Sequence, residues 1–259
     1  SSRPAPRRRP VAAARRREEQ GFDAIWWADH FLHWFPNSIW TPDLVAQAAA
    51  GQTSPHVWFD PFPVIAAAAG VTSDIALGVG VTDLVRRHPA VLAQTALTLD
   101  HLSGGRFILG VGSGESLNLE PVGLDNARPL ARLTEGLAVI RALFDTPEPI
   151  DFDGEFTTLR EMTLGLRPYG AAAPPVWVAA HRPKGLALAG RTADGWLPLT
   201  TEPAAYTAML GQVRAASRAA GRPENAVTPG VYARVVLTEN RDAAEAIIDA
   251  SLLMRFIAL

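Results

Sequence analysis

The strongest candidate for proton chemistry in this chain is an aspartate–histidine pair, Asp29 and His30, which directly follows the apolar run "AIWWA". A histidine at the end of a strand can donate or accept a proton near neutral pH. Asp29 could orient the ring or accept a hydrogen bond from a ligand. The pair lies within Ile25–Trp40, which holds four of the seven tryptophans of the chain. Such a stretch is consistent both with a large piece of core and with a pocket that has aromatic walls.

Two further strand ends contain side chains that suit a ligand. Glu115 follows a G-x-G-x-G turn, and a carboxyl group pressed against an apolar ligand has a raised pKa and can act as an acid. The alternative is a carboxylate that accepts N–H bonds within its own turn. The stretch "AAHRPKG" (Ala179–Gly185) leads from a strand into a helix. The free N–H groups at that helix start, together with Arg182 and Lys184, suit an anionic group such as phosphate.

Several kinds of site are excluded or disfavoured by the sequence. The chain has no cysteine, which excludes disulfides, thiolate catalysis and zinc bound by cysteine. Its six histidines show no metal-ligand spacing, so we expect no metal site. The stretches "GVGVTD" and "GVGSGE" lack the full dinucleotide-binding pattern, and "GSGES" is not a nucleophile elbow. The net charge of −2 argues against nucleic-acid binding.

The composition indicates a folded protein without a membrane span. With 259 residues, of which 48% are hydrophobic, the chain can bury a large core. Its arginine-rich start could indicate an export or nuclear signal, but no apolar stretch of signal-peptide length follows. We therefore interpret Pro10 as a helix start and Val11–Gln20 as the basic, solvated face of that helix. A soluble, cytoplasmic protein is expected.

The chain alternates between apolar runs typical of buried strands and segments with helical spacing. The predicted strands are Ala24–Ala28, Asp74–Val81, Gly105–Gly112, Pro175–Ala180, Asp194–Leu199 and Gly230–Thr238. The predicted helices are Val11–Gln20, Pro42–Ala50, Pro61–Gly70, Pro89–Leu102, Pro129–Phe144, Pro183–Arg191, Pro203–Ala220 and Asp242–Phe256. A small hairpin is expected at Ile150–Arg160, where alternation and an Asp-Gly turn interrupt the rhythm.

Alternating strands and helices predict an α/β fold with a parallel sheet, either an open doubly wound sheet or a closed (β/α)8 TIM barrel. In a barrel the active residues lie at the C-terminal ends of the strands, whereas an open sheet concentrates them at one crevice. Polar residues follow four separate strands here, which favours the barrel. Six strands are two short of eight, and none precedes the first helix. We therefore expect one domain, 1–259, that lacks barrel elements at both ends.

These features together resemble the luciferase-like monooxygenase superfamily, and most of all its branch that uses the deazaflavin coenzyme F420. The resemblance covers about Gly21 to Pro229. It rests on the segments "GFDAIWWADHF", "DPFPVIAAAAGVTSDIALGVGVTD", "RRHPAVLAQTALTLDHLSGGRFILGVGSGESLNLEPVG", "VWVAAHRPKGLALAGRTADGW" and "GRPENAVTP". The segment between His30 and Asp60 is similar to that of phthiodiolone-type ketoreductases, and the chain also resembles reductases of the methylenetetrahydromethanopterin type.

The resemblance implies a luciferase-like (β/α)8 barrel with a small inserted hairpin, and usually a homodimer. It implies that Asp29 and His30 lie beside the deazaflavin ring, and that Gly80–Val81 forms a strand bulge, often with a cis peptide bond, behind the ring. The other residues that it implies are Thr82 after the bulge, Gly114, Glu115 and Asn118 near the ring and tail, Ala179, Ala180 and His181 near the phosphate, and Trp34 as an active-site aromatic. The family has a second Gly-Gly pair where this chain has His181–Arg182.

The activity that the resemblance implies is transfer of a hydride between F420 and a carbon of a carbonyl, an alcohol or a similar organic substrate. His30 would exchange a proton with the substrate oxygen or the ring, Glu115 would be a second acid or anchor the ring, and the substrate would lie under Trp34. The aromatic walls favour a large apolar substrate. The alternatives are an FMN-dependent monooxygenase of the same fold and a barrel that binds a flavin or deazaflavin without turnover.

Overall fold

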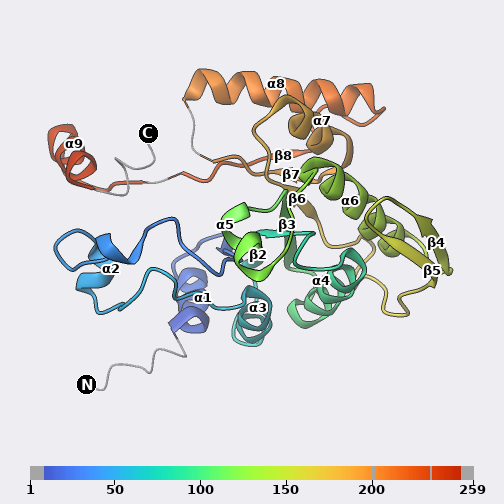
Figure 1. The fold of residues 1–259 in the computed structure, drawn as a ribbon, viewed down its shortest axis with the longest axis horizontal. Coiled ribbons are helices and arrows are strands. Elements are labelled where there is room, and N and C mark those ends of the chain that lie inside the picture. The colour runs from blue at the N-terminus through green and yellow to red at the C-terminus, as the bar shows by residue number, and fades with distance from the viewer. Residues whose placement is uncertain (1–8, 200–201, 234, 252–259) are drawn as a thin grey trace. The chain divides into compact units, whose positions relative to one another are not determined.

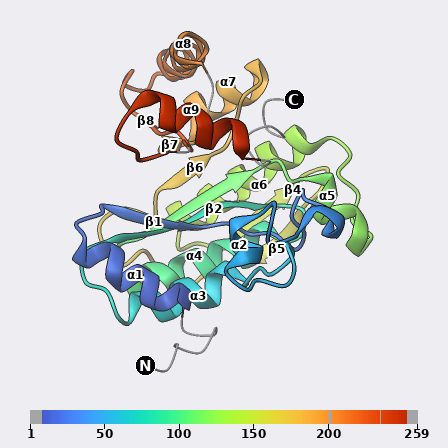
Figure 2. The ribbon, with the colours of Figure 1, turned by 90° about the vertical axis from the view of Figure 1, so that its left-hand side faces the viewer.

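The computed structural model describes residues 9–199, 202–233 and 235–251. The chain divides into two compact units. The larger unit comprises Ser1–Asp29 and Phe59–Val231, and the smaller unit comprises His30–Trp58 and Tyr232–Leu259. Figures 1 and 2 together label the α-helices and strands of both units.

Among the described residues, the larger unit is built on a parallel sheet of six strands (Figure 1). In spatial order the strands are β1 (Ala24–Trp27), β2 (Ala76–Asp83), β3 (Phe107–Gly112), β6 (Val176–Val178), β7 (Gly195–Trp196) and β8 (Thr228–Pro229). Each of the first five pairs in parallel with the strand of this sheet that follows it along the chain. A doubly wound sheet reverses its strand order at a switch point, so the sequential order favours the barrel type of sheet.

Helices connect these strands and cover one face of the sheet. They are α1 (Arg9–Glu19), α3 (Pro61–Ala69), α4 (Pro89–Ser103), α6 (Pro129–Asp145), α7 (Pro183–Thr192) and α8 (Pro203–Ala219), while the short α5 (Ser116–Leu119) and η3 (Glu120–Val122) follow β3. Helices α1, α3 and α4 lie together on one side of β1 and β2 (Figure 2). Five of the longer helices begin at a proline, which suits the first helical position because its N–H group would have no partner there. These prolines made the helix starts predictable.

The core of the larger unit lies between the sheet and these helices. Successive side chains of a strand point to opposite faces of the sheet, so alternate residues enter the core. On β2 these are Leu77 and Val79, and on β3 they are Phe107, Leu109 and Val111, all of them fully buried. Hydrophobic burial of these side chains holds the helices on the sheet.

The opposite face of the sheet is occupied by two tryptophans that lie over glycines. Trp26 of β1 lies over Gly78 of β2, where an added Cβ would come within 2.4 Å of the indole. Trp177 of β6 lies over Gly195 of β7, where the corresponding distance is 2.1 Å. The two indole rings are 5.2 Å apart. Trp27 packs against the helix-side core instead, so only one of the two neighbouring tryptophans points to this face.

The expected hairpin is present and is anchored on α6. Its strands are β4 (Ile150–Asp153) and β5 (Thr158–Met162), which pair in antiparallel fashion. The Glu135 carboxylate of α6 accepts the backbone N–H groups of Glu155 and Phe156, at 2.7 and 2.9 Å. The Arg132 guanidinium lies 4.3 Å from the centre of the Phe156 ring. Two side chains of α6 thus hold the turn of the hairpin.

The last predicted strand, Gly230–Thr238, is wrong. The strand at this end of the described sheet, β8, ends before that segment begins, and Gly230 donates its N–H to the Trp196 carbonyl oxygen at 2.8 Å. Beyond it, Val235 and Leu237 are 77% and 91% exposed, and residue 234 lies outside the described residues. The apolar, β-branched composition predicts a strand, but no described neighbour covers these side chains.

The smaller unit contains three short helices among its described residues. They are η2 (Asn37–Ile39), α2 (Ala46–Ala49) and α9 (Arg241–Ala250). Helix α2 is shorter than the predicted Pro42–Ala50, and the part of the predicted helix Asp242–Phe256 beyond Ser251 lies outside the described residues. In the described parts of the chain, we find no helix with the length and apolar character needed to cross a membrane.

Candidate functional site

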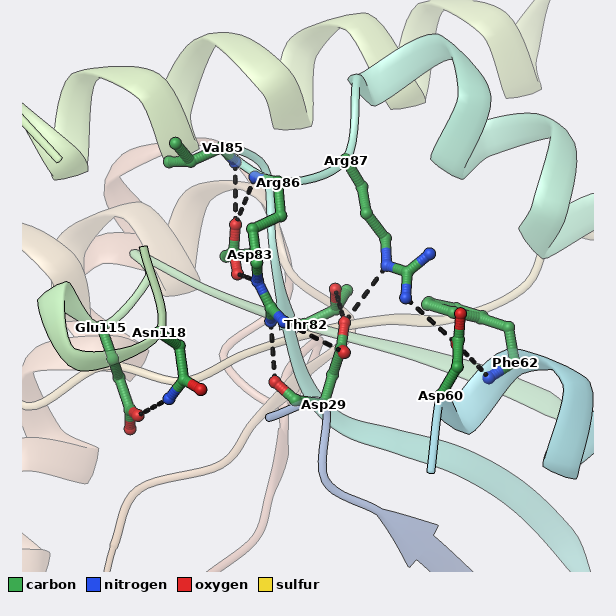
Figure 3. Close-up of polar contacts among 10 residues, drawn as sticks. All are labelled: Asp29, Asp60, Phe62, Thr82, Asp83, Val85, Arg86, Arg87, Glu115 and Asn118. Atoms are coloured by element: carbon green, nitrogen blue, oxygen red, sulfur yellow. Dashed lines mark hydrogen bonds and ion pairs between the residues drawn. The ribbon is translucent and has the colours of Figure 1, made fainter. Parts of the chain in front are cut away.

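Asp29 is the centre of a buried polar network at the C-terminal end of β1 (Figure 3). Its side chain is only 4% exposed. The Thr82 hydroxyl donates to Asp29 Oδ2 at 2.6 Å, and Arg87 Nε donates to the same oxygen at 3.2 Å. Arg86 donates to Asp29 Oδ1 from Nη1 at 3.3 Å and to the Asp29 carbonyl oxygen from Nη2 at 2.7 Å. Donors of this chain therefore hold both the carboxylate and the backbone directly before His30.

Arg86 joins the end of β1 to the loop after β2. Its Nε donates to Asp83 Oδ2 at 2.5 Å, while its two other guanidinium nitrogens donate to Asp29. Asp83 Oδ1 accepts the backbone N–H groups of Val85 and Arg86, at 3.0 and 2.7 Å. The side chains of Arg86 and Asp83 are 8% and 5% exposed. Each of these buried charges is thus compensated by an opposite charge and by hydrogen bonds, as burial requires.

Arg87 extends the network to α3. Its Nη2 donates to Asp60 Oδ1 at 3.1 Å, and its guanidinium lies 4.4 Å from the centre of the Phe62 ring. Asp60 also caps α3, since Oδ1 accepts the Phe62 N–H at 3.1 Å. Burial lowers the pKa of Arg87, but the charges of Asp29 and Asp60 and the hydrogen bonds to them outweigh burial and raise the pKa above its ordinary value.

Sequence patterns alone do not point to Arg86 or Arg87 as part of the site. The signal that could have found them is the stretch "TDLVRRHP", in which two arginines stand between a buried strand and a helix that begins at Pro89. Charged residues that directly follow a buried strand lie at the end of the sheet where ligands bind in barrels. A search for partners of Asp29 among such residues would have selected them.

The strand bulge expected at Gly80–Val81 is present at the C-terminal end of β2. The register of β2 against β3 shifts between Val79 and Thr82, and the peptide bond between Gly80 and Val81 is cis. Gly80 and Val81 are partly exposed, whereas Thr82 is buried and donates to Asp29. The structure therefore brings Asp29, Gly80, Val81 and Thr82 together at one end of the sheet.

Gly114, Glu115 and Asn118 form a turn that leads from β3 into α5. Gly114 has a φ of 81°, in the left-handed region that favours glycine. Asn118 donates from its backbone N–H to the Glu115 carbonyl oxygen at 2.8 Å and from Nδ2 to Glu115 Oε2 at 3.0 Å. Asn118 is buried and Glu115 is exposed. A Cβ added to Gly114 would lie 3.6 Å from the Asp83 Cβ, so this turn is adjacent to Asp83 and its arginine partner.

The aspartates of this region pair with arginines and do not gather around a position for a metal. Asp29 pairs with Arg86 and Arg87, and Asp83 pairs with Arg86. Among the residues that the structure describes, no group of three or more histidine, aspartate or glutamate side chains could hold a metal ion.

A cavity of about 640 Å³ lies where β6 leads into α7. Its lining includes Ala179, Ala180, His181, Arg182, Lys184, Ser113, Leu130 and Leu133. Arg182 is the N-cap residue of α7, and its side chain makes no capping hydrogen bond. The first-turn N–H groups of α7, with Arg182 and Lys184, make this wall positive. The cavity therefore suits a small molecule that has an anionic group.

His181 in this wall has a defined tautomer. Its Nε2 accepts the backbone N–H of Leu199 at 2.7 Å, so a neutral ring has its proton on Nδ1. Burial lowers the pKa of His181 below its ordinary value, and the charge of Arg182 lowers the pKa further. The position where the family has a glycine thus holds a histidine that ties the end of β6 to the segment after β7.

We expect His181 to contribute a pH-dependent part of the free energy of unfolding. Because its folded-state pKa is depressed, this stabilisation is complete above the unfolded pKa of about 6.5 and is lost as the pH falls from there through the folded pKa. Urea unfolding at about pH 5.5 and about pH 7.5 measures the loss. His181→Gln, which can still accept the Leu199 N–H, should lose less stability on acidification than the parent protein. Equal losses in both would contradict this contribution.

His30 and Trp34 belong to the aromatic cluster of the smaller unit. The His30 ring lies 5.0 Å from the Trp58 ring, with 47° between their planes. The Trp34 ring lies 6.2 Å from the His33 ring, and Trp34 is 39% exposed. The tryptophan-rich stretch is therefore divided. Its first part ends β1, and its second part forms a cluster of aromatic rings.

The sequence matches one protein family over almost its whole length. The family model described as luciferase-like monooxygenase matches residues 1–258. The chain belongs to this family. This luciferase-like chain is 37% identical over 257 residues to the phthiodiolone/phenolphthiodiolone dimycocerosates ketoreductase of Mycobacterium tuberculosis, a match that covers 98% of this chain and 66% of the relative. It is 29% identical over 240 residues to the 5,10-methylenetetrahydromethanopterin reductase of Methanolobus tindarius, which covers 93% and 64%.

Solved structures confirm the predicted luciferase-like barrel fold. An F420-dependent secondary alcohol dehydrogenase in complex with an F420–acetone adduct has a TM-score of 0.74 and 26% identity, over 86% of this chain and 64% of the other. A coenzyme F420-dependent tetrahydromethanopterin reductase from Methanopyrus kandleri has a TM-score of 0.76 and 22% identity, over 97% of this chain and 68% of the other. At this identity the likeness is evidence for the fold only. The luciferase-like chain spans slightly less than two thirds of the curated relatives that it matches.

Proposed function

We propose that this chain takes part in F420-dependent transfer of a hydride between the deazaflavin and a carbonyl or alcohol group. The single observation that supports this most is the cavity beside α7, because it combines a positive wall with a volume of about 640 Å³. Sites for small molecules in proteins measure about 300–1,000 Å³. The choice of F420 is supported by the likeness to an F420-dependent alcohol dehydrogenase and to a ketoreductase.

The residues around the cavity fit a cofactor with an anionic phosphate. Arg182 and Lys184 supply positive charge. The first-turn N–H groups of α7 supply donors, because the side chain of the N-cap residue makes no hydrogen bond to them. Ala179 and Ala180 have small side chains, which permit close approach of a ligand to the backbone. When bound, F420 supplies the carbon that gives or takes the hydride. The protein binds and orients the reactants and holds the proton.

In this proposal His30 is the general acid or base, and it exchanges a proton with the substrate oxygen. Asp29 positions His30 through the backbone that they share. The Asp29 carbonyl oxygen and carboxylate are fixed by hydrogen bonds from Arg86, Arg87 and Thr82. We further propose that Glu115 is a second acid or anchors the ring and that Trp34 covers the substrate. The residues proposed to lie beside the cofactor are Asp29, Gly80, Val81, Thr82, Gly114, Asn118, Ala179, Ala180 and His181.

The substrate in this proposal is large and apolar. Trp34 and Trp58 of the smaller unit are 39% and 36% exposed, and apolar side chains at a surface favour apolar ligands. The relative in Mycobacterium tuberculosis is named as a ketoreductase of phthiodiolone dimycocerosates. We also propose that residues 1–259 belong to one luciferase-like domain and that the enzyme is a cytoplasmic homodimer, as the family resemblance implies.

A cofactor titration tests the proposed function. The protein is mixed with F420 or with FMN, binding is followed by absorbance and fluorescence, and a panel of ketones and alcohols is then added. We expect F420 to bind and its absorbance to change on hydride exchange with members of the panel. Binding of FMN alone would overturn the choice of cofactor and favour an FMN-dependent monooxygenase. Binding of F420 without any hydride exchange would favour a non-catalytic barrel.

Replacing Lys184 by alanine is expected to weaken F420 binding about fivefold. The side chain is exposed, so we assign it roughly 1 kcal/mol, the upper value for an exposed charge pair. Fluorescence titration at low salt measures the change in Kd. Arg191→Ala is the control, because it removes the same charge from the last turn of the same helix and should leave Kd unchanged. Similar weakening in both variants would contradict a direct contact of Lys184 with the cofactor.

A further inference from the structure

His33 is the centre of the aromatic cluster in the smaller unit. Its ring stacks on Phe35 at 4.8 Å and on Trp58 at 5.8 Å, with 23° and 13° between the ring planes. Trp34 and Trp40 approach the same ring at 6.2 and 6.1 Å, both tilted. Phe35 is 3% exposed, so the cluster has a buried base. His33 is thus surrounded by aromatic rings that limit its movement.

Backbone hydrogen bonds also fix the His33 ring. Its Nδ1 accepts the Phe35 N–H at 3.1 Å, so a neutral ring has its proton on Nε2. The backbone N–H of His33 donates to His56 Nδ1 at 3.1 Å, and the backbone N–H of His56 donates to the Ser54 hydroxyl at 3.1 Å. His33 and His56 therefore use ring nitrogens to hold the local backbone.

Trp58 connects this fixed histidine with His30. The indole that stacks on His33 also contacts the His30 ring, at 5.0 Å with 47° between the planes. Aromatic pairs have preferred offset and tilted geometries because of the ring quadrupole. We propose that Trp58 is a positioning residue that is anchored on His33 and fixes the orientation of the His30 imidazole. Its importance for turnover rests on the proposed function, in which His30 exchanges the proton.

The orientation of His30 matters because proton exchange requires a donor–acceptor distance of about 2.6–3.2 Å. A ring that samples several orientations spends less time at that distance from a substrate oxygen. Removal of the indole leaves the His30 side chain present but takes away the surface against which its ring lies. The expected consequence is a lower kcat, with the KM for F420 unchanged.

Steady-state kinetics of three variants tests this positioning. Trp58→Ala is expected to lower kcat about tenfold, the upper end of what one aromatic pair contributes. Trp58→Phe keeps a ring at the position and should recover most of the rate. Val57→Ala is the matched control, because Val57 is the neighbouring residue, is 53% exposed and contributes no ring. A fall in kcat that Val57→Ala shares, or a Trp58→Ala variant with the parental kcat, would overturn the proposal.

The imidazole C–H signals of His30 in NMR spectra give a readout that does not depend on turnover. They are expected to shift and broaden in Trp58→Ala, because the ring current and the fixed orientation are both lost, and to stay in place in Val57→Ala. Unchanged signals in Trp58→Ala would overturn the positioning role. If these signals change in Trp58→Ala but the parent protein shows no hydride exchange, the positioning role is supported and the proposed function is overturned. Failure of the positioning role and failure of the proposed function are therefore distinguishable.

Discussion

Replacing Arg86 by alanine is expected to lower the free energy of unfolding by about 3–5 kcal/mol, as removal of one partner from a buried ion pair does. The Arg86 side chain is 8% exposed and donates to both Asp29 and Asp83, whose side chains are 4% and 5% exposed. Without it, the buried Asp83 carboxylate loses its cationic partner, and Asp29 keeps Arg87 and the Thr82 hydroxyl. The cost of a buried, uncompensated charge accounts for most of the effect. Urea unfolding followed by circular dichroism measures it.

Arg87→Ala is the matched control for this prediction. It removes the same side chain one residue along, but Arg87 is 29% exposed and its second partner, Asp60, is 50% exposed, so we expect a loss of about 1 kcal/mol. Arg86→Lys keeps the charge but not the planar group that reaches both aspartates. Its loss in the free energy of unfolding should lie between the losses of the two alanine variants. Equal destabilisation by Arg86→Ala and Arg87→Ala would contradict the central place of Arg86 in the network.

Two of the strands predicted from this sequence have both faces covered. The predictions Asp74–Val81 and Gly105–Gly112 agree with β2 and β3 within two residues at each end. Every core-facing position of these strands is apolar, and glycines and small side chains fill much of the other face. Gly230–Thr238 has the same kind of composition, yet Val235 and Leu237 are exposed. Local composition predicts a tendency to be buried, but it does not show whether a neighbouring element is present.

Site residues can be located from local motifs, but their partners cannot. Asp29, Glu115 and His181 were found because each directly follows an apolar run. Arg86 is 57 residues from Asp29 in the chain, and no short pattern signals such a long-range pair. The ring contacts of Trp58 with His30 and His33 likewise form only when the chain folds. A sequence thus shows which residues could do chemistry, while the contacts that hold them in place require the structure.

Replacing His30 by alanine is expected to lower kcat for hydride exchange between F420 and a ketone by about 10²–10⁴-fold, the contribution of a positioned general acid or base. The KM for F420 should change little, because the proposed cofactor contacts are made by other residues. The Asp29 network should also remain, since Asp29 is held by its own arginine and threonine partners. Stopped-flow and steady-state measurements of the deazaflavin absorbance give both constants.

Two controls separate proton exchange by His30 from a general effect of losing a histidine. His101→Ala removes a histidine that contacts the Arg167 carbonyl oxygen, at 2.8 Å from Nε2, and the Tyr169 ring. Neither residue is assigned to the reaction, so this variant should leave kcat unchanged. Added imidazole should restore part of the rate of His30→Ala, because a small base can occupy the vacated space and exchange the proton. A His30→Ala variant that turns over at the parental rate would remove His30 from the mechanism. Glu115 would then be the next candidate, because its exposed carboxylate adjoins the Asp29 network.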